Sequence, residues 1–230
     1  QEDQTDKLQT LLSQTAKEGR ALFLPQGSYA LSKDIAISSN YQLIGDTTGA
    51  TILHNATGTP IQLTDTTYGT KTNVRLQNIA FDGINVTLKL TNQLTLANNI
   101  FYNPLKGFVV NLNADIGVKI SGNIFMRDTA HMQPGIDFNR AIYIGGYSTP
   151  SRFQYMSDVD IVDNLFGLKV TELDAIKSTS RSDLAATITR LQTAIEAGAI
   201  SVPNEKNYLS TGVNSFNMLK DVTVQHNFFY

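Results

Sequence analysis

Six side chains able to move protons or offset a negative charge lie close together in the sequence: Arg127, Asp128, His131, Asp137, Arg140 and Tyr143. An arginine can neutralise a carboxylate, an imidazole can take a proton, and a phenol can protonate a leaving oxygen. A base-initiated elimination beside a carboxylate requires these three roles. A surface loop would also account for His131, so the cluster needs a structural context before it indicates a reaction.

Motifs of several other reaction classes are absent. The sequence contains no Walker loop, no GxSxG, no HExxH and no GxGxxG. It has no cysteine and only three histidines, so we expect no metal and no cofactor. Its net charge of −2 argues against nucleic acid as a partner, although a local basic patch could bind an acidic substrate. No apolar run approaches the roughly 18 residues of a membrane span.

One pattern, Val-x-Ile-x-x-Asn-x-Phe, recurs along the chain and must position these side chains. Its five copies cover 74–81, 94–101, 118–125, 159–166 and 222–229. Two apolar residues two apart face one side of a strand, and the phenylalanine returns to the interior after a corner. The copies are 20, 24, 41 and 63 residues apart. Repeats of this length predict stacked coils of short strands, with insertions in the longer intervals.

The asparagine of the pattern is expected at the corner of each coil. There its amide can hydrogen-bond the backbone of the neighbouring coil and stack on the next asparagine. We predict a structural ladder formed by Asn99, Asn123, Asn164 and Asn227. In the first copy Ile79 takes this place, so the ladder should begin one coil later.

Side chains that point outward from the strands should form rows on the surface. The middle residues of the main strands predict one row of Arg75, Thr95, Lys119, Asp160 and Thr223. Lys119 would then lie close enough to Asp160, its neighbour in this row, to form an ion pair between coils. Segments 86–90, 108–112 and 141–144 predict a second set of strands, whose outward row would be Lys89, Val109 and Tyr143.

The N-terminal part of the sequence begins with a helix and continues with short strands. Residues 3–19 carry leucines at helical spacing; Asp3 or Thr5 can cap the start, and Gly19 suits the end. ALFLPQGSYAL (21–31) predicts a buried strand that turns at its proline and glycine, and YQLIGD and ATILH follow as strands. This order resembles the opening of the pectate lyase-like right-handed parallel β-helix superfamily, by motif over 3–54 and by repeat over most of the rest.

The resemblance implies an all-β fold, a right-handed parallel β-helix with an N-terminal capping α-helix and a helical insertion near 171–200. It also implies a carbohydrate-active protein, a lyase or C5-epimerase acting on an acidic, uronate-containing polysaccharide. Lys119 and Arg140 are 21 residues apart, about one coil, and this spacing resembles the Lys/Arg pairs of β-helix alginate and chondroitin lyases, whose flanking motifs do not match. We predict Lys119, Arg140, Tyr143 and His131 as catalytic residues, and as substrate-binding residues Arg75, Lys89, Arg127, Asp137 and Asp160.

Other functions stay open. A glycoside hydrolase would need paired carboxylates, for which Asp160 and Asp163 are candidates, but an adjacent Asp-Asp pair is absent. A calcium-dependent lyase would need an acidic cluster, and only Asp160 lies in the outward row. A non-catalytic glycan-binding or structural β-helix, such as an adhesin or a phage spike, would need none of these groups.

We expect a single β-helix domain over 1–230, divided into a cap helix (1–19), coils (20–170), an inserted helical arm (171–217) and the start of a further coil (218–230). In the arm, Ser182 can cap a helix and Gly198 can end it, and the helix should pack on the coils through Leu184, Ile188, Leu191 and Ile195.

The C-terminal coil shows no cap, although a β-helix normally needs one at each end. We therefore expect a further C-terminal chain or a partner to cover this end. The absence of cysteine fits a secreted or periplasmic bacterial protein.

Overall fold

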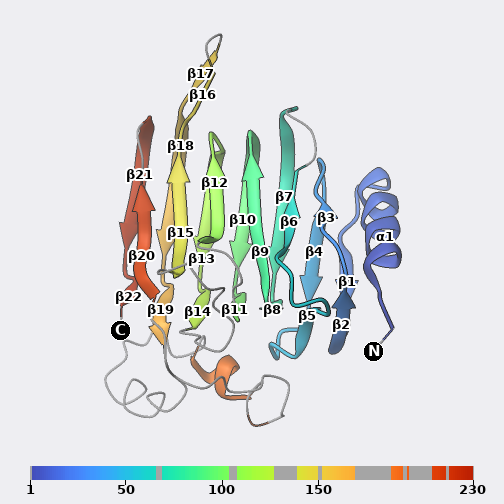
Figure 1. Cartoon of the computed structure of the whole chain (residues 1–230). Coiled ribbons are helices and arrows are strands. Elements are labelled where there is room, and N and C mark those ends of the chain that lie inside the picture. The colour runs from blue at the N-terminus through green and yellow to red at the C-terminus, as the bar shows by residue number, and fades with distance from the viewer. Residues whose placement is uncertain are drawn as a thin grey trace.

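In the computed structural model of the chain, three parallel sheets wind into stacked coils, which form a parallel β-helix (Figure 1). The structure describes residues 2–65, 69–103, 108–126, 139–149, 152–168, 188–193, 196, 209–215 and 218–229. The predicted fold is confirmed. Two sheets contain seven strands, more than the five copies of the repeat, because the first two coils lack its asparagine and phenylalanine.

Each coil contributes one strand to each sheet in turn. The first sheet contains β1 (Leu22–Leu24), β4 (Gln42–Gly45), β7 (Lys71–Gln77), β10 (Thr91–Ala97), β13 (Ile116–Ser121), β18 (Met156–Val162) and β21 (Leu219–Gln225). The second contains β2 (Gly27–Leu31), β5 (Thr51–Asn55), β8 (Ala80–Asp82), β11 (Ile100–Tyr102), β14 (Ile124–Met126), β19 (Leu165–Leu168) and β22 (Phe228–Phe229). The third contains β3 (Ile35–Ala36), β6 (Ile61–Thr64), β9 (Ile84–Lys89), β12 (Phe108–Asn113), β15 (Asn139–Gly145) and β20 (Leu209–Ser215).

Besides the helical residues 188–193, a helix and a hairpin lie outside the three sheets. Helix α1 (Thr5–Lys17) closes the N-terminal end of the stack, and the antiparallel hairpin of β16 (Tyr147–Thr149) and β17 (Arg152–Gln154) projects from its edge (Figure 1). Within the described ranges, no helix is long and apolar enough to cross a lipid bilayer.

The start and end of α1 follow the sequence signals closely. The carboxylate of Asp3 accepts hydrogen bonds from the Ser32 hydroxyl and from the hydroxyl and backbone N–H of Thr5, and these bonds lower the pKa of Asp3 to about 2. At the other end Gly19 takes a left-handed conformation with φ of 66°. Leu8 and Leu12 are buried against the first coil.

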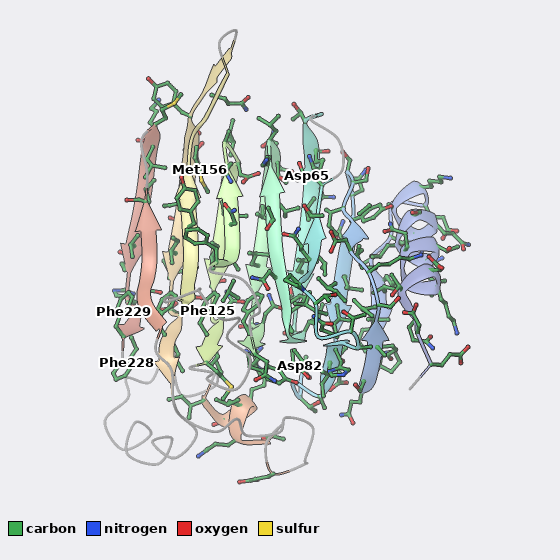
Figure 2. All side chains as sticks on the ribbon, viewed as in Figure 1. Asp65, Asp82, Phe125, Met156, Phe228 and Phe229 are labelled. Atoms are coloured by element: carbon green, nitrogen blue, oxygen red, sulfur yellow. The ribbon has the colours of Figure 1, made fainter. Side chains whose placement is uncertain are left out.

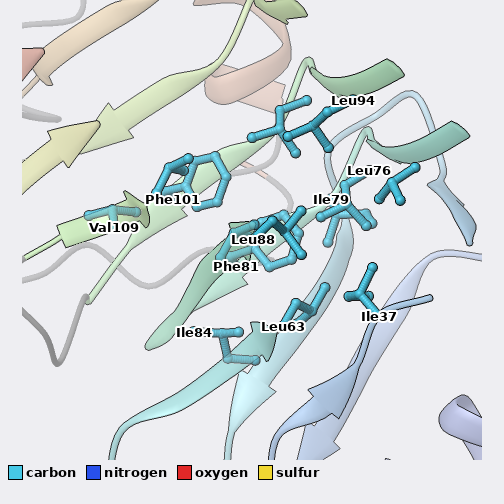
Figure 3. Packing of buried hydrophobic residues seen from close by; sticks show 14 of the residues in the cluster. Ile37, Leu63, Leu76, Ile79, Phe81, Ile84, Leu88, Leu94, Phe101 and Val109 are labelled. Atoms are coloured by element: carbon cyan, nitrogen blue, oxygen red, sulfur yellow. The ribbon is translucent and has the colours of Figure 1, made fainter. Parts of the chain in front are cut away.

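The interior is a continuous apolar column built from inward-facing residues of all three sheets. Figure 3 shows Leu76, Phe81 and Leu94 among the side chains that pack together there, and each is at most 1% exposed. The phenylalanines of the repeat form one stack, with ring centroids 4.8 to 5.0 Å apart and planes within 9° of parallel: Phe81, Phe101, Phe125, Phe166 and Phe229 (Figure 2 labels Phe125 and Phe229). This distance is the spacing of hydrogen-bonded strands, so the rings stack because the coils do.

The predicted asparagine ladder is present. Its first asparagine is Asn99, one coil after Ile79, as predicted. The Oδ1 atom of Asn123 accepts the backbone N–H of Asn99 at 2.9 Å, and its Nδ2 donates to the Leu96 carbonyl at 2.9 Å. The Oδ1 atom of Asn99 accepts the backbone N–H of Ile79 in the same way, at 3.1 Å. Asn164 and Asn227 continue the pattern.

The residue before each ladder position turns the chain from the first sheet into the second. These residues are left-handed, with φ between 55° and 63°: Asn78, Asn98, Gly122, Asp163 and His226. Glycine, asparagine and aspartate adopt this conformation at the lowest cost. Each two-residue corner therefore begins with a left-handed residue, and in every copy after the first an asparagine that binds the preceding coil follows it.

We expect Asn123→Ala to lower the free energy of unfolding by roughly 2–5 kcal/mol, because the Asn99 amide and the Leu96 carbonyl would stay buried without this partner. Denaturant unfolding followed by circular dichroism would measure the change. Thr95→Ala, on the outer face, is the control and should change stability by no more than about 0.5 kcal/mol. Equal stability of the two variants would contradict a stabilising ladder.

The corner between the third and first sheets holds buried charges. The Lys71 ammonium lies 2.9 Å from the Asp65 carboxylate, and both side chains are at most 6% exposed (Figure 2 labels Asp65). Lys71 also donates to the carbonyls of Gly69 and Lys89, each at 3.0 Å. These acceptors compensate for removing the ammonium from water.

Asp115 lies in the same corner, two coils beyond Lys71, and is fully buried. Its Oδ1 atom accepts the Thr91 backbone N–H at 2.6 Å, while Oδ2 has no hydrogen-bond partner among the residues that the structure describes. Burial raises the pKa of Asp115 from 3.8 to about 7, the charge of Asp65 adds to this, and hydrogen bonds from Thr91 and Asn113 oppose it. The carboxyl group is therefore largely protonated in the folded protein at mildly acidic pH.

The fold should lose stability as the pH rises from about 4 to about 7, since the folded state holds the Asp115 proton more tightly than the unfolded chain does. The expected loss is a few kcal/mol. Asp115→Asn should remove this part of the pH dependence, measured by denaturant unfolding across the same range. The exposed Asp160→Asn serves as the control, and an unchanged pH slope in Asp115→Asn would refute the assignment.

Candidate functional site

The outward row of the first sheet is aligned as predicted. Arg75, Thr95, Lys119, Asp160 and Thr223 are consecutive register partners on β7, β10, β13, β18 and β21. Lys119 and Asp160 are both exposed, and no salt bridge joins them among the described residues. Arg75 donates to the Gln77 side chain at 2.7 Å, so its guanidinium is held along its own strand.

The predicted pairing of Lys119 with Arg140 is wrong as a cross-coil contact. Lys119 lies on β13 in the first sheet, and Arg140 lies on β15 in the third sheet of the same coil. Their 21-residue separation measures the path from one face of a coil to another. The next-coil partner of Lys119 is Asp160, and that of Arg140 is Thr211.

The outward row predicted for the second set of strands is also wrong. Val109 is buried in the main core, and Lys89 is aligned with Asn113 rather than with Tyr143. The row that contains Tyr143 runs through Thr64, Thr87, Asn111, Tyr143 and Asn214 on β6, β9, β12, β15 and β20. We call this set the third-sheet row.

Tyr143 is half-buried in this row. Its ring packs on Phe108 at a centroid distance of 5.0 Å and a tilt of 59°. Its hydroxyl end lies over Gly145, where a Cβ atom would come within 2.9 Å of the phenolic oxygen. Glycine at this position therefore lets the phenol lie flat along its strand.

The neighbouring polar groups of the third-sheet row are held by hydrogen bonds. Asn113 donates to the Asn111 carbonyl oxygen at 2.8 Å, and the Thr87 hydroxyl donates to Gln62 at 2.9 Å. Asn85, buried under the start of this face, donates to the backbone carbonyl of Phe108. The face thus presents amides, a hydroxyl and a phenol in fixed positions.

The helical arm covers the outer face of the second sheet. Residues 188–193 are helical, and Ile188 and Leu191 are fully buried against outward residues of that sheet, among them Ile100, Ile124 and Leu165. Arg190 donates to the Gly122 carbonyl at 3.3 Å, and burial lowers its pKa to about 10. Ser182, Leu184, Ile195 and Gly198 lie outside the described residues. The arm was predicted to extend to residue 217, but 209–215 form β20 of the third sheet.

A family model described as rhamnogalacturonase A/epimerase, pectate lyase-like, matches residues 1–199 of the chain. The chain belongs to this family. Neither the search of curated proteins nor the search of solved structures found a match. The match spans α1 and the coils through β19, which carry Asn99, Asn123 and Asn164 of the ladder and most of the third-sheet row. The protein is therefore a pectate lyase-like, carbohydrate-active β-helix protein.

Several of the predicted site residues lie outside the described residues: Arg127, Asp128, His131 and Asp137. They belong to the segment that leads into β15, the strand of Arg140 and Tyr143. Their predicted roles stay predictions, as do the catalytic roles of Lys119, Arg140 and Tyr143. The structure brings Arg140, Tyr143 and Lys89 to one sheet and places Lys119, Arg75 and Asp160 on another.

Sequence reasoning missed a pair of ionisable groups on the second sheet of this pectate lyase-like helix. His54 on β5 and Asp82 on β8 are register partners, and His54 Nδ1 lies 2.7 Å from Asp82 Oδ2. Asn103 donates to the other Asp82 oxygen at 2.6 Å. His54 and Asp82 are the only ionisable residues of β5 and β8, and this was the signal that could have revealed the pair.

Asp160 and Asp163, the two carboxylates predicted for a hydrolase, lie in different parts of their coil. Asp160 points outward from β18, whereas Asp163 lies in the corner beyond it, 3.8 Å from His226. Within the described ranges, no group of three or more His, Asp or Glu side chains is arranged to hold a metal ion.

Proposed function

We propose that the protein binds an acidic, uronate-containing polysaccharide on the solvent face of the third sheet and alters it by elimination or C5 epimerisation. The observation that carries the proposal is the aligned row of Thr87, Asn111 and Tyr143 on three successive coils. Membership of a family described by a rhamnogalacturonase and an epimerase supports a carbohydrate ligand.

The chemistry of the third-sheet row suits a sugar polymer. A hydroxyl, an amide and a phenol can each donate to and accept from sugar hydroxyls. The half-exposed Tyr143 ring also offers an apolar face with a polar tip. Because coils repeat at about 4.8 Å, a polymer lying along the stack would meet such groups at regular intervals.

Two cationic residues belong to strands of this sheet, and positive charge near the row would favour acidic sugars. Lys89 is on β9, two residues beyond Thr87, and Arg140 is on β15, three residues before Tyr143. A guanidinium can bind a carboxylate with two hydrogen bonds, and neutralising that carboxylate makes the adjacent C5 proton more acidic.

We place the proton transfers at the same face. In elimination, a base takes the C5 proton, the C–H electron pair forms a C4–C5 double bond, and the C4–O bond breaks with protonation of the leaving oxygen. Tyr143 is the candidate acid, and His131, in the segment before β15, is the candidate base. Epimerisation would instead return a proton to the opposite side of C5. We further propose that the protein acts outside the cytoplasm of a bacterium, where such polymers occur.

Tyr143→Ala should weaken binding of a defined oligouronate at least about 10-fold, because it removes both the ring and the phenol. Isothermal titration calorimetry would measure the affinity. Lys119→Ala, on the first sheet, is the matched control and should bind like the wild type. An affinity that falls in Lys119→Ala and not in Tyr143→Ala would move the binding face to the first sheet.

Turnover should appear as ultraviolet absorbance of an unsaturated uronate product or as solvent deuterium incorporated at C5. Tyr143→Phe should retain binding within a few-fold and lose elimination at least 100-fold, since it keeps the ring and lacks the acid. Alginate, pectate and glycosaminoglycans are the substrates to compare. Retained binding with neither product from any of them would show a non-catalytic glycan-binding β-helix.

A further inference from the structure

The second sheet carries only two charged or imidazole side chains along its seven strands, and they touch each other. These residues are His54 and Asp82, whereas the other positions of the strands are apolar, small or uncharged. Part of the same outer face is covered by Ile188 and Leu191 of the helical arm. An ionisable pair at the border of a covered apolar face is an unusual use of a strand position.

The pair is oriented by a third residue from the next coil. One carboxylate oxygen of Asp82 forms a hydrogen bond with His54 Nδ1 at 2.7 Å, and the other accepts one from the Asn103 amide at 2.6 Å. Asn103 adopts a left-handed conformation with φ of 53°, which keeps its amide directed at Asp82. Because a carboxylate only accepts, Nδ1 carries a proton, and Nε2 lies on the opposite side of the ring.

The imidazole remains accessible from outside. The His54 side chain is 39% exposed, while that of Asp82 is 17% exposed (Figure 2 labels Asp82). The neighbouring positions in this row add no charge: Ala30 precedes His54, and Tyr102 follows Asp82. Tyr102 is 3% exposed, and burial together with the charge of Asp82 raises the pKa of its phenol, so it stays neutral.

The pair also borders the proposed binding face. A single residue, Gly83, separates Asp82 from β9, the strand that carries Thr87 and Lys89. Gly83 takes a φ of 68°, so the chain turns sharply from one sheet into the other. A polymer that crosses this corner from the third-sheet row would pass the imidazole.

We propose that His54, held by Asp82 and Asn103, is a subsite for a sugar carboxylate and makes polysaccharide binding depend on pH. This inference rests on the proposed function, because it needs an acidic polymer on the third sheet. When the ring is protonated, Nε2–H donates a charge-assisted hydrogen bond to the carboxylate; when it is neutral, that donor is lost. Lower pH therefore favours binding.

The chain supplies a matched pair for comparison. His226 Nδ1 lies 3.8 Å from Asp163 Oδ1 in the corner between the first and second sheets, where both side chains are more exposed than those of His54 and Asp82. That corner leads into β22 and not into the third sheet. An effect shared by both histidines would therefore be a general charge effect and not a subsite.

The experiment measures the affinity of a defined oligouronate by calorimetry at about pH 5.5 and about pH 8, a range in which imidazole changes charge. Wild type and His226→Gln should bind roughly 10-fold more tightly at the lower pH. His54→Gln should lose this difference and match the weaker affinity at both values.

The outcomes separate this inference from the proposed function. If the wild type binds oligouronates equally well at both pH values, or if His54→Gln keeps the pH dependence, the subsite is wrong while the binding face stands. If the wild type binds no oligouronate at either pH, both proposals fail. A neutral oligosaccharide of equal length should show no pH dependence, and circular dichroism of each variant reports whether it is folded.

Discussion

The corner asparagines fix the distance and register between coils, and every other row of side chains inherits that register. Each one accepts a backbone N–H and donates to a backbone carbonyl of the preceding coil, as Asn123 does with Asn99 and Leu96. These groups are buried, so leaving them unpaired would cost far more than a surface hydrogen bond contributes. The phenylalanine stack repeats at 4.8 to 5.0 Å because the ladder does. A surface row such as Thr87, Asn111 and Tyr143 is therefore as regular as the core beneath it.

A common interior leaves the three outer faces free to differ in chemistry. The first sheet alternates cationic, neutral and acidic residues, so its row binds no single kind of charge. The second is largely apolar apart from His54 and Asp82, and it is partly covered by residues 188–193. The third carries amides, hydroxyls and a phenol, with a lysine and an arginine close by. Only this last combination offers both hydrogen bonds to sugar hydroxyls and countercharges for uronates.

The sequence was sufficient for those features that lie inside the repeated pattern. The ladder, the phenylalanine stack and the row through Lys119 were predictable because each copy has the same number of residues from the first strand to the corner. The row of the third sheet was not, because the corners before it differ in length. One residue separates β8 from β9, whereas residues 103–107 separate β11 from β12. Counting from the repeat therefore selected Lys89 and Val109 in place of Thr87 and Asn111. Variable corner lengths are also the reason why Lys119 and Arg140, about one coil apart in the sequence, lie on different sheets. The contact between His54 and Asp82 was not predicted because the two residues are 28 positions apart.

The pair of Lys71 with Asp65 and the pair of His54 with Asp82 differ in how far the protein encloses the basic side chain. Lys71 is enclosed by a carboxylate and two carbonyls, so its three N–H donors are occupied. Its charge therefore serves only to stabilise the corner. His54 has one acceptor on one ring nitrogen and a side chain that is more than a third exposed. Enclosure suits a structural role, because any opening would admit water to a desolvated charge. Partial exposure suits recognition, because a ligand can complete the hydrogen bonding that the fold begins. By this criterion Lys71, at the corner before the first sheet, has a structural role. His54, at the corner before the third sheet, has the accessibility that the proposed binding role requires.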